Sequence, residues 1–306
     1  MERKRQVSNE SGRKLLDRFV LQEKIGTGGM GDIYKALDLR RQEAGEELPY
    51  LAIKVLNPKF AERPDAFIAL QREASKTRPI ASKNIVQVYD FDRDEDLAFM
   101  EMEILDGEPL DQYLVSYPNG APREKALQII DELCQGLIEA HAHNIVHSDI
   151  KPANLFCTAD GSVKLLDFGL ARAVQNPGTA AKGDTQTLFD PGSLGALTPA
   201  YASYEMLSGE VPSRSCDVFA AALVAYEVLS GNHPFNRKPA DHALSEGLVP
   251  KRLKILKGRQ WRALANALAL TRERRTESIE AFREGLLRPS MLSRVINDLK
   301  RMVGGN

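Results

Sequence analysis

The amino-acid sequence predicts an α+β protein in two parts, a small sheet accompanied by one helix and then a larger, mainly helical part. Two observations predict this order. Between Phe19 and residue 105, apolar segments rich in β-branched and aromatic residues are separated by turn residues, as strands are. After Asp106 and Gly107, apolar residues recur at steps of three and four, which is the spacing of a buried helix face.

The first part contains five predicted strands, in chain order FVLQEKI (19–25), GDIYKAL (31–37), YLAIKVL (50–56), NIVQVYDF (84–91) and LAFMEMEIL (97–105). The charged connection over 40–49 contains glycine and predicts a solvated loop. Apolar residues at helical steps predict the single helix over 64–79. Residues 1–17 are mostly polar and basic, and we expect them to form a flexible lead.

The second part begins with a predicted helix over 122–144. One clear hairpin follows in 154–169, with Asp160 and a glycine at its turn. Residues 173–200 are rich in Gly, Pro, Ala and Thr and predict one long loop, which is usually functional or disordered. Helices dominate the remainder. Apolar residues at helical spacing in 288–306 predict a last helix, packed on this part or binding a partner or a membrane.

Composition excludes several classes of protein. The formal net charge of −1 gives no overall field that would hold nucleic acid or an anionic membrane. The longest near-apolar run, 218–229, is too short to span a bilayer, and the first residues lack the apolar core of a signal peptide. The three cysteines have no metal-ligand spacing and suit a reducing compartment. We therefore expect a cytoplasmic protein without a membrane span.

Gly26, Gly28 and Gly31 form a G-x-G-x-x-G pattern, which alone is a weak signal. In a dinucleotide-binding fold a helix would start at the third glycine. Here Ile33 and Tyr34 continue as an alternating strand instead. Two strands joined by a glycine loop form a flap whose backbone N–H groups can close over phosphates. The alternatives are a dinucleotide-binding turn and a plain hairpin.

Lys54 lies in an otherwise apolar strand, where an unpaired ammonium group would be costly. It needs an anion, and Glu73 on the following predicted helix is the natural candidate. Such an ion pair would direct the lysine at the α- and β-phosphates of a nucleotide. The alternative is that Lys54 extends to the sheet edge and Glu73 is one charge on a solvated face.

The stretch HSDIKPANLF (147–156) brings Asp149, Lys151 and Asn154 close together, and Asp167 follows at the end of an apolar strand. A polar turn would explain any one of them. The hairpin between the two sites returns the chain beside itself, so Asn154 and Asp167 can be oxygen ligands of Mg²⁺. Asp149 could then accept the proton of an attacking hydroxyl, and Lys151 could neutralise a transferring phosphoryl group.

These motifs together resemble the eukaryotic-like protein kinase family, and most closely its bacterial members. GTGGMGDI is similar to its glycine-rich loop, LAIK to its third-strand lysine motif, HSDIKPAN to its catalytic loop and DFG to its metal-binding triplet. The resemblance implies a bilobal α+β fold, with a small antiparallel sheet and one helix in the N-lobe. The implied boundaries are a lead over 1–17, an N-lobe over 18–105, a C-lobe over 106–287 with its activation segment over 167–205, and a tail over 288–306.

The resemblance also implies roles for individual residues. Met102 would be the gatekeeper, Glu103 to Leu105 the hinge whose backbone reads adenine, and Glu108 a ribose contact. The expected ATP-binding residues are Ile25, Gly26, Gly28, Gly29, Gly31, Ile33, Ala52, Lys54, Glu73, Met102, Glu103, Leu105 and Glu108. The expected structural or regulatory residues are His147, Phe168, Gly169, Thr185, Thr187, Thr198, Glu205, Asp217 and Arg275. Among these, Thr198 would contact Asp149, Asp217 would brace the catalytic loop, and Glu205 would pair with Arg275.

One departure from the family pattern carries information about regulation. Ser148 stands where the family usually has an arginine that pairs with a phosphate on the activation segment. We therefore expect basal activity to depend little on phosphorylation there, although Thr185 and Thr187 are plausible autophosphorylation sites. Tyr204 stands where proline is usual, and Thr77 where an apolar residue is preferred, which weakens the case for a rigidly held active state.

The function predicted from the sequence is that of a serine/threonine protein kinase using ATP with Mg²⁺, or Mn²⁺. Lys151 and Thr198 resemble the serine/threonine branch of the family. Autophosphorylation through a transient dimer is expected. A pseudokinase scaffold would ordinarily lack Lys54, Asp149, Asn154 or Asp167, and all four are present. A small-molecule kinase would lack the long loop and the TPAYASYE segment, which look like a docking platform for a peptide.

Overall fold

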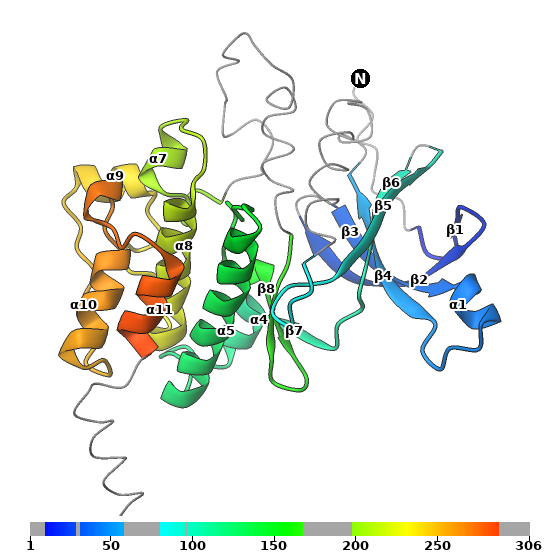
Figure 1. The fold of residues 1–306 in the computed structure, drawn as a ribbon, viewed down its shortest axis with the longest axis horizontal. Coiled ribbons are helices and arrows are strands. Elements are labelled where there is room, and N and C mark those ends of the chain that lie inside the picture. The colour runs from blue at the N-terminus through cyan, green and yellow to red at the C-terminus, as the bar shows by residue number, and fades with distance from the viewer. Residues whose placement is uncertain (1–9, 29–30, 58–79, 96, 168–197, 288–306) are drawn as a thin grey trace, which may run out of the picture.

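The computed structural model describes residues 10–28, 31–57, 80–95, 97–167 and 198–287. These residues form two lobes side by side, a sheet drawn in blue and cyan and a helical part drawn from green to red (Figure 1). The predicted helix over 64–79, most of the predicted activation segment and the tail over 288–306 lie outside the described residues.

The small lobe is one antiparallel sheet with the strand order β1-β2-β3-β4-β6-β5. Its strands are β1 (Lys14–Leu15), β2 (Phe19–Gly28), β3 (Gly31–Asp38), β4 (Tyr50–Leu56), β5 (Val88–Asp94) and β6 (Leu97–Met102). Because side chains alternate along a strand, each face carries its own apolar cluster. Ala52 and Met100 belong to one cluster, and Ile53 and Phe99 belong to the other.

Two parts of the small lobe differ from the expectation. Within the predicted lead, residues Lys14–Leu15 pair with β2, and the side chain of Leu15 is fully buried. The connection predicted as a solvated loop begins with a short helix, α1 (Leu39–Glu43), because the carboxylate of Asp38 accepts a hydrogen bond from Arg40 N and caps its first turn.

The large lobe consists mainly of helices. They are α4 (Leu110–Val115), α5 (Arg123–Ala142), α7 (Tyr204–Leu207), α8 (Arg214–Ser230), α9 (Ala240–Ser245), α10 (Gly258–Ala267) and α11 (Ile279–Leu287), with short 3₁₀ turns at Pro152–Asn154 and Arg272–Arg274. No helix among the described residues is both long and apolar enough to cross a membrane.

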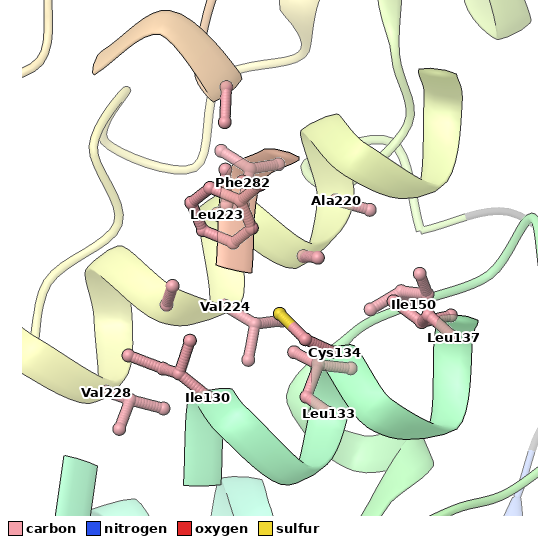
Figure 2. Packing of buried hydrophobic residues seen from close by; sticks show 14 of the residues in the cluster. Ile130, Leu133, Cys134, Leu137, Ile150, Ala220, Leu223, Val224, Val228 and Phe282 are labelled. Atoms are coloured by element: carbon pink, nitrogen blue, oxygen red, sulfur yellow. The ribbon is translucent and has the colours of Figure 1, made fainter. Parts of the chain in front are cut away.

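The core of the large lobe lies between α5, α8 and α11. Cys134 of α5, Val224 of α8 and Phe282 of α11 belong to one cluster, and Ile150 of the segment after α5 joins it next to Leu137 (Figure 2). The burial of these side chains is the main stabilising contribution of this lobe, at about 25 cal/mol for each Å² removed from water. Because Ile150 lies between Asp149 and Lys151 in the chain, its burial in this cluster anchors the segment that carries both residues.

A second antiparallel sheet lies where the lobes meet. It contains β7 (Gly107–Pro109), β8 (Leu155–Thr158) and β9 (Val163–Leu165), in that order. The predicted hairpin is the pair β8 and β9, and Gly161 at its turn has a φ of 86°, which favours glycine. Ile85, from the segment that leads into β5, forms a parallel bridge with Leu165 of β9. The small lobe therefore contacts the strand that ends two residues before Asp167.

Candidate active site

Lys54 lies on the face of β4 that carries Ala52, opposite Met100 of β6, and it is 2% exposed. Its Nζ lies 2.6 Å from Oδ1 and 2.7 Å from Oδ2 of Asp167. An ammonium group this deeply buried needs a carboxylate partner. The structure assigns that role to Asp167, while Glu73, the partner expected from the sequence, lies outside the described residues.

Backbone hydrogen bonds of Leu166 hold Asp167 in place. Leu166 N donates to the carbonyl oxygen of Asn154 at 2.9 Å, and the carbonyl oxygen of Leu166 lies 2.9 Å from Nε2 of His147. Asp167 itself has a φ of 59°, in the left-handed region that Asp tolerates better than most residues. This turn directs its carboxylate towards Lys54. The structure therefore brings His147, Asn154 and Asp167 together from two separate segments.

Asp149 lies at the centre of a small hydrogen-bonded group. Its Oδ2 accepts from Nζ of Lys151 at 2.8 Å and from Nδ2 of Asn154 at 2.9 Å. Lys151 Nζ also donates to the hydroxyl of Thr198 at 3.1 Å. The sequence predicts that Thr198 contacts Asp149. In the structure Lys151 lies between them and donates a hydrogen bond to both.

Burial raises the pKa of Asp149, and the neighbouring Lys151 and the amide of Asn154 oppose this effect only in part. A carboxylate with a raised pKa is a stronger base than one exposed to water. Its hydrogen-bond partners keep the side chain oriented. The group can therefore act as a proton acceptor.

Asp217 of α8 holds the backbone of the loop that carries Asp149. It is 1% exposed, and its two oxygens accept hydrogen bonds from the backbone N–H groups of His147 and Ser148, both at 2.9 Å. Nε2 of His141 lies 2.8 Å from the same carboxylate. Ser148 has a φ of 61°, a conformation that needs such support. The contribution of His141 was not foreseen from the sequence.

Glu205 of α7 and Arg275 form a bidentate ion pair with two distances of 3.1 Å. Arg275 also donates to the carbonyl oxygens of Ala269 and Leu270, and its side chain is fully buried. A planar guanidinium group suits such bidentate recognition of a carboxylate. The pair joins the segment that follows Thr198 to the end of the helical lobe.

The expected adenine-binding residues gather on one face of the small lobe. Ala52 and Met102 are buried there, and Ile33, Leu105 and Leu166 pack against the same cluster. The N–H of Glu103 donates to the carbonyl oxygen of Gln87, so any contact between this residue and adenine falls to its carbonyl group. Ile25 is exposed on β2, and Glu108 is exposed on β7.

The glycine loop shows why one of its glycines is required. Gly31 has a φ of 153°, and a Cβ at this position would lie 2.0 Å from the carbonyl oxygen of Val55. Any side chain would therefore separate β3 from β4. Gly26 and Gly28 lie on β2, where a Cβ would meet only ordinary contacts, whereas Gly29 lies outside the described residues.

The donor set at the site suits a hard divalent cation. Asn154 and Asp167 offer amide and carboxylate oxygens, which are the ligands that Mg²⁺ prefers. Among the described residues, no group of three or more His, Cys, Asp or Glu side chains could hold a metal ion by itself. A cation at this site would therefore need further oxygen ligands, and the phosphates of a nucleotide can supply them.

A small antiparallel sheet beside a helical lobe, with a buried lysine of the sheet paired to an aspartate after β9 and a loop that carries Asp149, Lys151 and Asn154, is the arrangement of a protein kinase domain. The protein kinase domain family matches residues 19–297 of this sequence, and the chain belongs to that family. The comparison covers both lobes and the site between them.

Curated relatives are bacterial serine/threonine kinases. The chain is 36% identical over 225 residues to serine/threonine-protein kinase PknB of Mycolicibacterium smegmatis, which covers 72% of this chain and 34% of that protein. It is 31% identical over 302 residues to PknB of Mycobacterium tuberculosis, covering 94% of this chain and 46% of that protein. The chain thus spans about a third to a half of the length of these relatives.

A solved structure has the same fold. The kinase domain of PknI from Mycobacterium tuberculosis superimposes with a TM-score of 0.69 at 23% sequence identity, covering 91% of this chain and 98% of that chain. The bilobal fold predicted from the sequence is confirmed.

Proposed function

We propose that this chain transfers the γ-phosphoryl group of ATP to serine and threonine hydroxyls of proteins. The observation that carries the proposal is the convergence of two groups at one site: Lys54 with Asp167, and Asp149 with Lys151 and Asn154. Hydrogen bonds of Leu166 connect the two groups.

Each of these side chains has a task in the proposed reaction. Asp149 accepts the proton of the attacking hydroxyl as its oxygen forms a bond to the γ-phosphorus and the bond to the β-phosphate oxygen breaks, which releases ADP. Lys151 lies next to Asp149 and neutralises charge on the transferring group. Lys54 orients the α- and β-phosphates. Asn154 and Asp167 would hold Mg²⁺, which would neutralise charge on the phosphates.

Several finer points belong to the same proposal. The oxygen atoms of both candidate ligands suit Mg²⁺, and they also suit Mn²⁺. The contact between Lys151 and Thr198 favours serine and threonine over tyrosine as the acceptor. Autophosphorylation in a transient dimer and a cytoplasmic location for the domain complete the proposed function.

Incubation with radiolabelled ATP tests the activity. The wild-type chain should label itself and a generic basic protein in Mg²⁺ buffer, and Asp149→Asn should reduce the label by at least about a hundredfold, because general base catalysis contributes that much. Sugars and aminoglycosides serve as controls for a small-molecule kinase. Label no higher than that of Asp149→Asn would favour a scaffold function instead.

A further inference from the structure

Strand β9, which leads directly to Asp167, is held along both edges. On one edge it pairs with β8. On the other, Leu165 N donates to the carbonyl oxygen of Asn84, and Val86 N donates to the carbonyl oxygen of Leu165, both at 2.9 Å. The segment around Asn84 therefore acts as a short parallel neighbour of β9.

Two side chains extend this edge to Val163, the first residue of β9. Nδ2 of Asn84 donates to the carbonyl oxygen of Val163 at 2.9 Å, and Val163 N donates to Oε2 of Glu132 at 2.6 Å. The two side chains also contact each other, with 3.3 Å between Nδ2 of Asn84 and Oε2 of Glu132. On this edge of β9, the N–H and the carbonyl group of Val163 are thus bound by the side chains of Glu132 and Asn84.

Burying the polar side chains of Asn84 and Glu132 costs free energy unless their hydrogen bonds are satisfied. Glu132 of α5 is 9% exposed and Asn84 is 1% exposed. A buried carboxylate is tolerated only when hydrogen bonds satisfy it, and Gln128 supplies a third one at 3.1 Å. Gly136, one turn further along α5, allows the close approach: a Cβ there would lie 2.8 Å from the carbonyl oxygen of Asn84.

We propose that Asn84 and Glu132 are positioning residues that set the register of β9 and thereby place Asp167 against Lys54. A register slip of one residue would move Asp167 by about 3.3 Å along the strand. Its carboxylate now lies 2.6 Å from Lys54 Nζ, so such a slip would break the contact. The inference rests on the proposed function, because it assigns Asp167 to the nucleotide and its metal ion.

The test compares variants of Glu132 in the full chain. Glu132→Ala removes the acceptor of Val163 N and should raise the KM for ATP, and the Mg²⁺ concentration needed for half-maximal rate, by about tenfold, as the loss of a supporting partner of a metal ligand does. Glu132→Gln keeps an acceptor oxygen and should restore both values to within about threefold of wild type. Glu124→Ala, at an exposed position on the same helix, is the matched control.

Calorimetric titration with Mg-ADP provides a readout that needs no turnover, and Glu132→Ala should weaken this binding by about tenfold. If Glu132→Ala does not fold, Asn84→Ser, which removes the amide without adding charge, should give the same shifts. The inference is overturned if the variants lower the melting temperature while the KM for ATP, the Mg²⁺ requirement and Mg-ADP binding stay at wild-type values. A wild-type chain that binds Mg-ADP but labels no protein would instead contradict the proposed function and leave the binding test of Glu132 valid.

Discussion

Glu101 offers the sharpest test of the electrostatics of the small lobe. It lies on β6 beside Asp90 of β5 and is 5% exposed. Burial raises its pKa to about 7. Arg18 opposes the shift, and the charges of Asp90 and Asp92 add to it. Arg18 forms hydrogen bonds of 2.9 and 2.6 Å with Asp38. Because that carboxylate already balances its charge, Arg18 stabilises the ionised form of Glu101 only in part.

The expected effect on stability follows from the pKa. A tenfold change in the acid constant corresponds to about 1.4 kcal/mol, so a pKa of about 7 against the ordinary 4.5 makes the ionised side chain cost about 3 kcal/mol. The folded chain binds more protons than the unfolded chain between these two values. Stability should therefore fall as pH rises through this window and stay lower above it. Glu101→Gln cannot ionise and removes the cost.

Urea unfolding of wild type and Glu101→Gln at about pH 5 and about pH 8 measures this effect. The free energy of unfolding of the variant should exceed that of wild type by up to about 3 kcal/mol at the higher pH and by much less at the lower pH. Glu47→Gln, the same change at an exposed position in the connection before β4, is the control and should leave the difference between the two pH values close to that of wild type. Equal pH dependence of wild type and Glu101→Gln would refute the reasoning.

Three further predictions concern the large lobe and the catalytic loop. Arg275→Met leaves Glu205 buried without its partner and should lower the free energy of unfolding by about 3–5 kcal/mol, measured in urea; a loss under about 1 kcal/mol would contradict this. Alanine at both Thr185 and Thr187 should preserve most activity in a phosphate-free preparation, because Ser148, which precedes Asp149, has no guanidinium group to pair with a phosphate; complete loss would refute the expectation. The raised pKa of Asp149 predicts that kcat/KM falls as pH decreases, because protonation removes the base, and that the fall begins at a higher pH than for an exposed carboxylate; a value of kcat/KM that does not decrease on acidification would count against that role.

The site depends on contacts that are local to each lobe and on a few that join them. Asp217 and Ile150 hold the catalytic loop to the helical core. Lys54 and the segment around Asn84 reach Asp167 and β9 from the small lobe. A change in the angle between the lobes would therefore act first on Asp167, since both lobes contact it or its strand.

Much of this arrangement could be predicted from the sequence. The order of the strands and the first long helix follows from apolar periodicity, and the β8–β9 hairpin follows from its Asp-Gly turn. The need of Lys54 for an anion follows from its place in an apolar strand. These inferences succeed because they depend on neighbours within a few residues.

Other features were decided only by the tertiary structure. The described anion that contacts Lys54 is 113 positions away in the chain. The strand at Lys14–Leu15 is too short to show a period, and nothing in the spacing of Asn84 and Glu132 indicates that both bind Val163. The pKa of Glu101 depends on burial by strands that pair across the sheet. The sequence by itself determined which residues have chemistry to offer and which local elements carry them. Which of these residues meet was decided by the packing of the two lobes, because desolvation and hydrogen bonding depend on neighbours that sequence distance does not reveal.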